Sequence, residues 1–172
     1  TSNDSASNSG AVYTFWRIRD DNWMKNTFIK AANNDVNDYF GYRIALDNST
    51  KETRLVVGAY EEDSNQTTIT QGTSASSDDS TGGSGAAYVY KLTRDSNNVP
   101  VSWSQEAYIK AVQENKDDDK FGKSIGLNNG TLVIGAPDEE SNQTTITNGD
   151  SASSNRSSNR SGAVYIYNFT GE

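Results

Sequence analysis

Two pairs of adjacent carboxylates come closest to an enzyme site in this chain, Glu61 with Glu62 and Glu139 with Glu140. Glycosidases place two such acids on either side of a scissile bond. The chain contains no Cys and no His, which removes thiol nucleophiles, the commonest zinc ligand and the usual general base. A catalytic centre is normally one convergent set of residues, whereas these pairs occur once in each of two similar segments. We therefore predict that the protein is not an enzyme.

A run of three acidic residues, Asp117, Asp118 and Asp119, is the candidate for a metal site. Asp35 and Asp38 match it in part at the corresponding place of the earlier segment. Calcium takes about 6 to 8 oxygen ligands, so these carboxylates would need help from backbone carbonyls and water. A solvated acidic turn is the alternative. Calcium is thus the only cofactor that the sequence suggests.

The carboxylates belong to a structural unit that the chain repeats. Residues 40–59, FGYRIALDNSTKETRLVVGA, correspond to residues 121–136, FGKSIGLNNGTLVIGA, and each stretch leads toward a Gly-Ala-x-Tyr segment. Gly10, Gly85 and Gly162 begin three such segments, and with the other matching residues they set the period at about 78 residues. Self-similarity at one period is typical of propellers, solenoids and arrays.

Four β-type segments recur in the unit, and none of them has a helical period. The first is FGYRIAL or FGKSIGL, the second is RLVVGAY or TLVIGAP, the third begins at Gly-Ala-x-Tyr, and the fourth is NTFIKA or EAYIKA. The second segments are continuous apolar runs, as in strands covered on both faces, and turn-forming residues separate the segments. The sequence therefore predicts an all-β fold of antiparallel, four-stranded, blade-like repeats of the β-propeller type.

We expect three divisions of the chain. Residues 1–39 hold the third and fourth strands of a preceding repeat, residues 40–111 hold a complete repeat, and residues 112–172 hold a second repeat without its outer strand. The expected strands thus number two, four and three, and the last unit has an open edge. Natural proteins cover such edges, and the N-terminal strands of another copy could do so. The alternative is that the chain is an excerpt of a longer propeller whose flanking repeats supply the missing strands.

Phe-Gly opens each unit, and Gly-Ala closes its second strand. Phe would pack between neighbouring sheets, and Gly would let two backbones approach closely. The residues that carry this pattern are Phe40, Gly41, Gly58, Ala59, Phe121, Gly122, Gly135, Ala136 and Pro137. With the Gly-Ala-Val-Tyr-Ile-Tyr third strand, the pattern resembles the FG-GAP repeat family, which builds the integrin α-subunit β-propeller and many bacterial secreted proteins. The first unit departs from the family pattern at Tyr60, where Pro is expected.

The resemblance implies a non-enzymatic extracellular protein with a structural or adhesive role, completed by further copies of itself or by flanking repeats. Calcium-binding members carry an Asp/Asn-rich loop between the first and second strands, and the reduced loops here, residues 47–50 and 128–130, imply that this site is lost. Integrin-like propellers present loops to a protein or carbohydrate ligand. Trp16, Tyr42 and Tyr60 are candidate ligand contacts, unless they pack between sheets. Trp23 and Trp103, in matched positions, are expected to pack between sheets.

Long loops join the second and third strands at residues 61–84 and 138–161, and each has 24 residues. Both contain SNQTTIT, which predicts an ordered beginning that can add a further strand. Their second halves are rich in Ser and are expected to be flexible. A docking or ligand-binding role and a duplication without a selected role both remain open.

The composition fits a soluble or surface-exposed protein, and the family resemblance implies a location outside the cell. A net charge of -8 argues against a nucleic-acid partner, and no apolar run is long enough to span a membrane. Because Thr1 falls inside a repeat, we expect the chain to be a processed or excerpted piece. Asn-x-Ser/Thr sequons are either glycosylation sites or a consequence of the biased composition. They occur at Asn3, Asn48, Asn65, Asn129, Asn142, Asn155, Asn159 and Asn168.

Overall fold

The computed structural model describes residues 6–17, 22–49, 51–111 and 117–169, and every regular element in this part of the chain is a β-strand. The strands are β1 (Val12–Arg17), β2 (Trp23–Ile29), β3 (Arg43–Asp47), β4 (Arg54–Ala59), β5 (Thr70–Gln71), β6 (Ala86–Arg94), β7 (Pro100–Ile109), β8 (Ser124–Asn128), β9 (Thr131–Ala136) and β10 (Ala163–Asn168). Since these ranges contain no helix, they hold none that could cross a membrane. The predicted all-β fold is confirmed.

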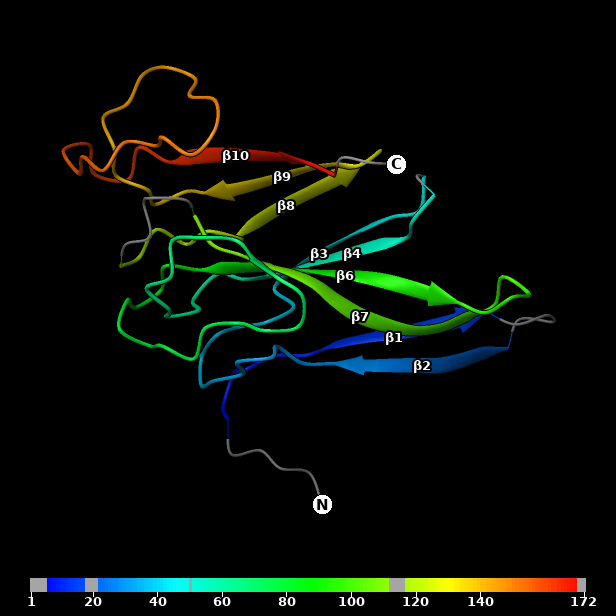
Figure 1. Cartoon of the computed structure of the whole chain (residues 1–172). Helices are drawn as coiled ribbons and strands as arrows, with labels where there is room; N and C mark the ends of the chain where they lie inside the picture. Colours follow the sequence, from blue (N-terminus) through cyan, green and yellow to red (C-terminus); the bar gives the residue numbers. More distant parts are fainter. Residues whose placement is uncertain (1–5, 18–21, 50, 112–116, 170–172) are drawn as a thin grey trace.

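The strands form three antiparallel sheets that lie one above another (Figure 1). The N-terminal sheet is β1-β2, the middle sheet is β3-β4-β6-β7 with β5 on its outer edge, and the C-terminal sheet is β8-β9-β10. β8 packs against β3 and β4 of the middle sheet, and β2 packs against β7. The order of strands is therefore the expected one, and β5 is the one strand that the expected two, four and three do not include. Among the described strands, β10 has no partner on its outer side.

Two hydrophobic cores lie between neighbouring sheets, and β6 contributes to both. Its alternation directs Tyr88 and Tyr90 to the N-terminal sheet and Ala87 and Val89 to the C-terminal sheet. The first core joins Val12, Ile29 and Ala31 to Phe40, Leu55, Val57, Tyr88, Tyr90 and Tyr108. The second core joins Val56, Ala87, Val89, Ala107 and Ile109 to Phe121, Leu132 and Ile134. Each sheet thus has an aromatic face toward the preceding sheet and an aliphatic face toward the next.

The two long loops begin alike but end differently. Gln66 donates to the carbonyl of Thr68 and to the hydroxyl of Thr70, and Gln143 makes the same two contacts with Thr145 and Thr147. Only the loop of residues 61–84 adds a strand, because β5 pairs with β7 and the C-terminal sheet has no strand in the corresponding place. The extra strand predicted for both loops is confirmed in the first and is wrong for the second. In Figure 1 the second loop, in orange, rises away from the sheets.

The expected packing of the matched tryptophans holds for only one of them. Trp103 on β7 is partly buried against the first core. Trp23 on β2 is 66% exposed, so its predicted role between sheets is wrong. The reason is positional, because Trp103 faces the N-terminal sheet and no described sheet lies on the corresponding side of β2.

Candidate functional site

The same backbone interaction joins both pairs of neighbouring sheets. Phe40 N–H donates to the carbonyl of Ser9 at 3.1 Å, and Phe121 N–H donates to the carbonyl of Ser84 at 3.0 Å. Two further bonds precede each of these, from residues 37 and 39 to residues 7 and 8, and from residues 118 and 120 to residues 82 and 83. We call residues 37–41 and 118–122 docking segments, and residues 7–10 and 82–85 acceptor segments. The Phe-Gly motif is therefore the end of a docking segment.

Close backbone contact explains the acceptor glycines. Gly10 and Gly85 have φ angles of 78° and 86°, and a Cβ on either would collide with the carbonyl oxygen of Phe40 or Phe121. A side chain at these positions would thus prevent docking as well as strain the backbone.

The other motif residues also meet across the junctions. Gly41 lies against the carbonyl of Ala11, Gly122 lies against the carbonyl of Ala86, and Gly58 lies against Gly122. The rings of Phe40 and Phe121 each pack edge-on against the tyrosine of their own third strand, with ring centroids 5.2 Å apart. In the C-terminal sheet Gly135, Ala136 and Pro137 meet no docked segment among the described residues. Ala59 and Ala136 are buried.

Residues 159–162 form a third acceptor segment that carries no docking segment within the described chain. Arg160 has a φ of 50° and Gly162 has a φ of 76°, which match the φ of 63° at Gly83 and of 86° at Gly85. A Cβ at Gly162 would meet only the Pro137 carbonyl oxygen, at 3.2 Å, as its nearest atom. A left-handed arginine is uncommon, so this segment holds the docking conformation at some cost in strain.

The outer face of the N-terminal sheet is apolar and exposed. Tyr13 on β1 is 54% exposed, whereas Tyr88, in the same position of the middle sheet, is fully buried against the N-terminal sheet. Phe15 and Phe28 show the same contrast with Tyr90 and Tyr108.

The outer face of the C-terminal sheet is also exposed, but it is aliphatic, not aromatic. Val164 and Ile166 on β10 are 66% and 64% exposed, whereas their counterparts Ala87 and Val89 on β6 are fully buried. The two end faces therefore correspond to the two sides of each internal junction.

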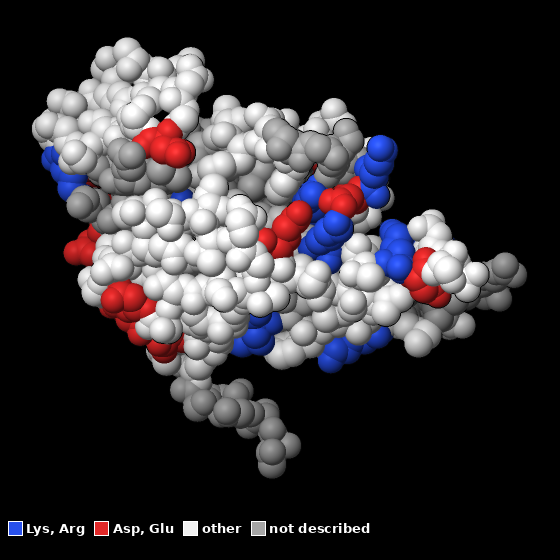
Figure 2. All heavy atoms as spheres, viewed as in Figure 1, with Lys and Arg blue, Asp and Glu red and all other residues white. Residues whose placement is uncertain are grey.

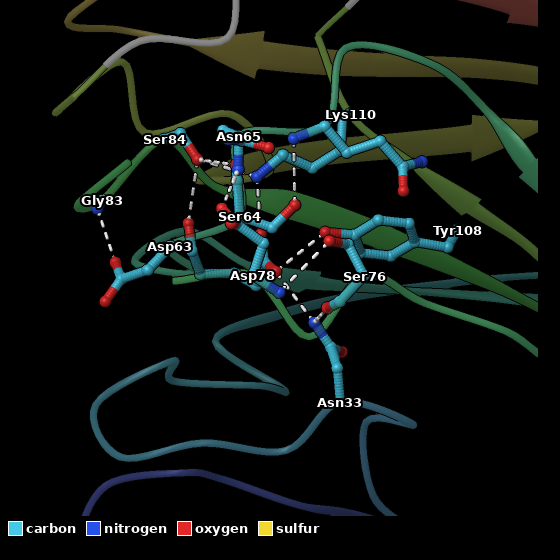
Figure 3. Close-up of polar contacts among 12 residues, drawn as sticks. Asn33, Asp63, Ser64, Asn65, Ser76, Asp78, Gly83, Ser84, Tyr108 and Lys110 are labelled. Atoms are coloured by element: carbon cyan, nitrogen blue, oxygen red, sulfur yellow. Dashed lines mark hydrogen bonds and ion pairs between the residues drawn. The ribbon is translucent and has the colours of Figure 1, made fainter. Parts of the chain in front are cut away.

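A buried polar cluster fixes the outer strand of the middle sheet (Figure 3). Glu62 accepts hydrogen bonds from Lys110 (2.5 Å), Tyr108 (2.8 Å) and Asn33 (2.8 Å), and Lys110 also donates to the hydroxyl of Ser84 (2.7 Å). Lys110 and Tyr108 come from β7 and its end, whereas Ser84 precedes β6. Burial lowers the pKa of Lys110, which Glu62 opposes, and burial raises the pKa of Tyr108. A buried ion pair with additional hydrogen bonds is costly to break.

This cluster was not predicted from the sequence. The signal was nevertheless present, because Ser-Gly-Ala recurs at residues 9–11, 84–86 and 161–163, Lys recurs at residues 30 and 110, and Glu recurs at residues 62 and 139.

The adjacent carboxylates do not form catalytic pairs. Glu61 contacts Lys120, whereas Glu62 turns into the buried cluster. Glu140 pairs with Arg156 at 2.8 Å, whereas Glu139 accepts from Ser141. Each pair is therefore divided between two structural contacts.

Two of the three aspartates of the candidate calcium site, Asp117 and Asp118, line an open polar hollow of about 600 Å³. Asp118 pairs with Lys120 at 2.8 Å, and Asp119 is buried with Arg156 3.7 Å away. Within the described residues no three acidic side chains come close enough together to hold a metal ion. Calcium binding therefore stays a prediction. Val36, Asn37, Tyr39, Glu61, Asp63, Ser80, Gly82, Gly83, Asp117 and Asp118 line the hollow.

The sequon asparagines that the structure describes are all exposed, as attachment of a glycan requires. They are Asn48, Asn65, Asn129, Asn142, Asn155, Asn159 and Asn168, and Asn3 lies outside the described residues. Glycosylation itself stays a prediction. On the face shown in Figure 2, acidic and basic side chains are intermixed, and no continuous basic surface crosses it.

Comparison with known proteins identifies the family of this chain. Residues 23–74 and 103–167, together more than half of the chain, match the family model of the FG-GAP repeat. The chain belongs to the FG-GAP repeat family. Searches of curated proteins and of solved structures find no significant match. FG-GAP repeats are typically non-catalytic structural or binding modules, usually of extracellular or surface proteins, and the all-β sheets agree with a β-propeller-type repeat module.

Each match to the FG-GAP repeat begins at a tryptophan of the outer strand, Trp23 or Trp103. The family unit therefore starts with the last strand of one sheet and continues through the docking segment into the next sheet. The junction between sheets lies inside the family unit.

Proposed function

We propose that this FG-GAP repeat protein is a non-enzymatic extracellular structural or adhesive protein that self-assembles by strand complementation into a fibre or larger array. The observation that carries the proposal is the third acceptor segment, residues 159–162, which has the backbone conformation of the two occupied ones. Beside it, β10 presents an open edge. Open strand edges and preformed acceptors favour addition of a matching strand.

The matching strand is β2 of another copy. β1 and β10 are both third strands, and β2 pairs with β1 as β7 pairs with β6. If β2 and the docking segment of residues 37–41 moved onto β10 and residues 159–162 of a second copy, they would complete a four-stranded sheet there. Such an exchange of one element between identical copies is a domain swap, and head-to-tail exchange makes open arrays. It would also cover Phe28 of the incoming β2 and the exposed face of β10.

The assembly is tested by the mass in solution, measured by light scattering after size-exclusion chromatography, with electron micrographs of the same fraction. We expect long polymers of the wild type. Gly162→Val should block docking and give monomers. Gly149→Val is the matched control, because Gly149 has a similar φ of 79° and no atom within 4 Å of an added Cβ. A monomeric wild type, or equal polymers of both variants, would overturn the proposal.

The second candidate is a ligand-binding adhesion module excerpted from a closed, integrin-like propeller. Tyr60 stacks with Tyr39 at 5.5 Å and packs on Tyr42 at 4.4 Å between ring centroids. Tyr39 and Glu61 also line the polar hollow. Aromatic faces beside carboxylates and amides suit a carbohydrate or protein ligand.

Binding to a glycan array distinguishes this second candidate. Loss of a bound glycan on Tyr60→Ala, with retention on Tyr13→Ala as an exposed aromatic control, would support it. Equal binding by the two variants would exclude the tyrosine cluster around Tyr60 as the ligand site.

A further inference from the structure

We infer that Glu139 and Ser161 form a preformed site for a lysine side chain, and that Lys30 of a second copy occupies it. The inference rests on the proposed strand complementation and names the side-chain contact that would select the incoming strand.

The middle sheet shows the occupied form of this site. Lys110 donates to Glu62 at 2.5 Å and to the Ser84 hydroxyl at 2.7 Å, and all three residues are buried. The Ser84 hydroxyl in turn lies 3.0 Å from the carbonyl oxygens of both Glu62 and Ser64, which share its single proton. The serine is thereby oriented with its lone pairs free to accept from the lysine.

The C-terminal sheet repeats this arrangement without the lysine. The Ser161 hydroxyl lies 3.1 Å from the carbonyl oxygen of Glu139 and 2.7 Å from that of Ser141, which share its single proton, as in the middle sheet. Glu139 is only 3% exposed, and within the described chain its carboxylate accepts only from the backbone and hydroxyl of Ser141. A buried carboxylate without a cation is costly, so the site favours a basic side chain.

Lys30, directly after β2, is the lysine that lacks a carboxylate hydrogen-bond partner among the described residues. Its ammonium group donates to the Ser9 hydroxyl at 2.6 Å and to the Gly10 carbonyl at 2.5 Å, and within the described residues it has no hydrogen bond to a carboxylate. Ser9 corresponds to Ser84 and Ser161, so Lys30 already makes the serine half of the contact.

The neighbouring residues of β2 also suit β10. Residues 28–31 read Phe-Ile-Lys-Ala and residues 108–111 read Tyr-Ile-Lys-Ala. On β6, Ala87 is opposite Ile109 and Tyr88 is opposite Tyr108. The same register on β10 would put Ile29 opposite Val164 and Phe28 opposite Tyr165. It would also bring Lys30 to Glu139 and Ser161.

The test is binding of a synthetic peptide of residues 22–33 to the full chain, measured by fluorescence anisotropy. We expect the peptide to bind, and its Lys30→Met form to bind at least about 10-fold more weakly, as expected when a buried charge loses its partner. Glu139→Gln in the protein should weaken the wild-type peptide similarly and abolish the difference between the two peptides. Glu140→Gln is the control, because Glu140 pairs with Arg156 in the loop.

The outcomes separate the two proposals. Equal binding of the wild-type and Lys30→Met peptides would overturn the lysine site while leaving strand complementation intact. No binding of either peptide to the wild-type chain, at concentrations where the chain remains folded by circular dichroism, would overturn complementation at β10 and the lysine site with it.

Discussion

The middle and C-terminal sheets are copies of one structural unit, and the described C-terminal sheet has no counterpart of β7 or of β5, which pairs with β7. In the middle sheet β7 supplies Lys110 to Glu62, pairs with β5, and covers β6. In the C-terminal sheet Glu139 has no lysine among the described residues, the long loop has no strand to pair with, and β10 is an edge.

The comparison teaches that the outer strand has three separate tasks. It neutralises a buried carboxylate, it holds the long loop, and it closes the sheet. Gln105 on β7 shows the second task, since its side chain donates to the carbonyls of Gly72 and Ser74 in the loop. Substitutions in the middle sheet can remove each of these interactions, and the same substitutions at matched positions of the C-terminal sheet serve as comparisons.

The largest expected effect is loss of the buried lysine. Lys110→Met should lower the free energy of unfolding by about 3–5 kcal/mol, because it leaves Glu62 buried without its cation. Glu139→Gln should not lower the free energy of unfolding, because Glu139 is the equivalent of Glu62 and has no cation partner among the described residues. Denaturant unfolding followed by circular dichroism measures both. Similar losses for the two variants would contradict the difference between the sheets.

The acceptor glycines give the second contrast. Gly85→Val should destabilise by about 2–5 kcal/mol, since the positive φ and the collision with Phe121 add together. Gly162→Val, studied in dilute monomeric protein, should cost only about 1–2 kcal/mol from the backbone conformation. If the two variants lost equal stability in thermal unfolding, the third acceptor segment would not be open.

The pH dependence of stability tests the burial of Asp38, which lies in the first docking segment. Burial, with nearby carboxylates, raises the pKa of Asp38 to about 7. The folded state therefore favours protonated Asp38, and the stability that this gives is lost as the pH rises from about 4 to about 7. Asp38→Asn should remove this loss, on the order of a few kcal/mol.

Denaturant unfolding of the wild type and of Asp38→Asn, measured between about pH 4 and pH 8, tests this prediction. Parallel profiles of stability against pH for the two proteins would contradict the role of Asp38.

The smallest effect is local and concerns the loops. Thermolysin cleaves before large apolar residues, and the matched residues Ile69 and Ile146 are 37% and 92% exposed. We expect cleavage before Ile146 to be about 10-fold faster, because β5 holds the other loop against β7. Mass spectrometry of timed digests measures both rates. Gln105→Ala should reduce the difference, whereas equal rates in the wild type would show that β7 does not hold the loop.

Much of the fold could be predicted because its signals are local and repeated. Alternation and turn residues indicate the strands, and the recurrence of Phe-Gly and Gly-Ala indicates one unit used again. The Glu62 to Lys110 contact could not be predicted in this way, since the two residues lie on different strands and nothing in their local sequence indicates burial. The prediction that Trp23 packs between sheets was wrong for a related reason. The environment of a repeated residue depends on which neighbouring sheet is present.

Hydrogen exchange measured by mass spectrometry over a range of protein concentrations tests the central claim most directly. We predict that protection of residues 159–168 rises with concentration as strands add to β10, while the protection of β6, which is already paired on both sides, stays constant. Protection of residues 159–168 that is low and independent of concentration would contradict the claim that this edge accepts another copy.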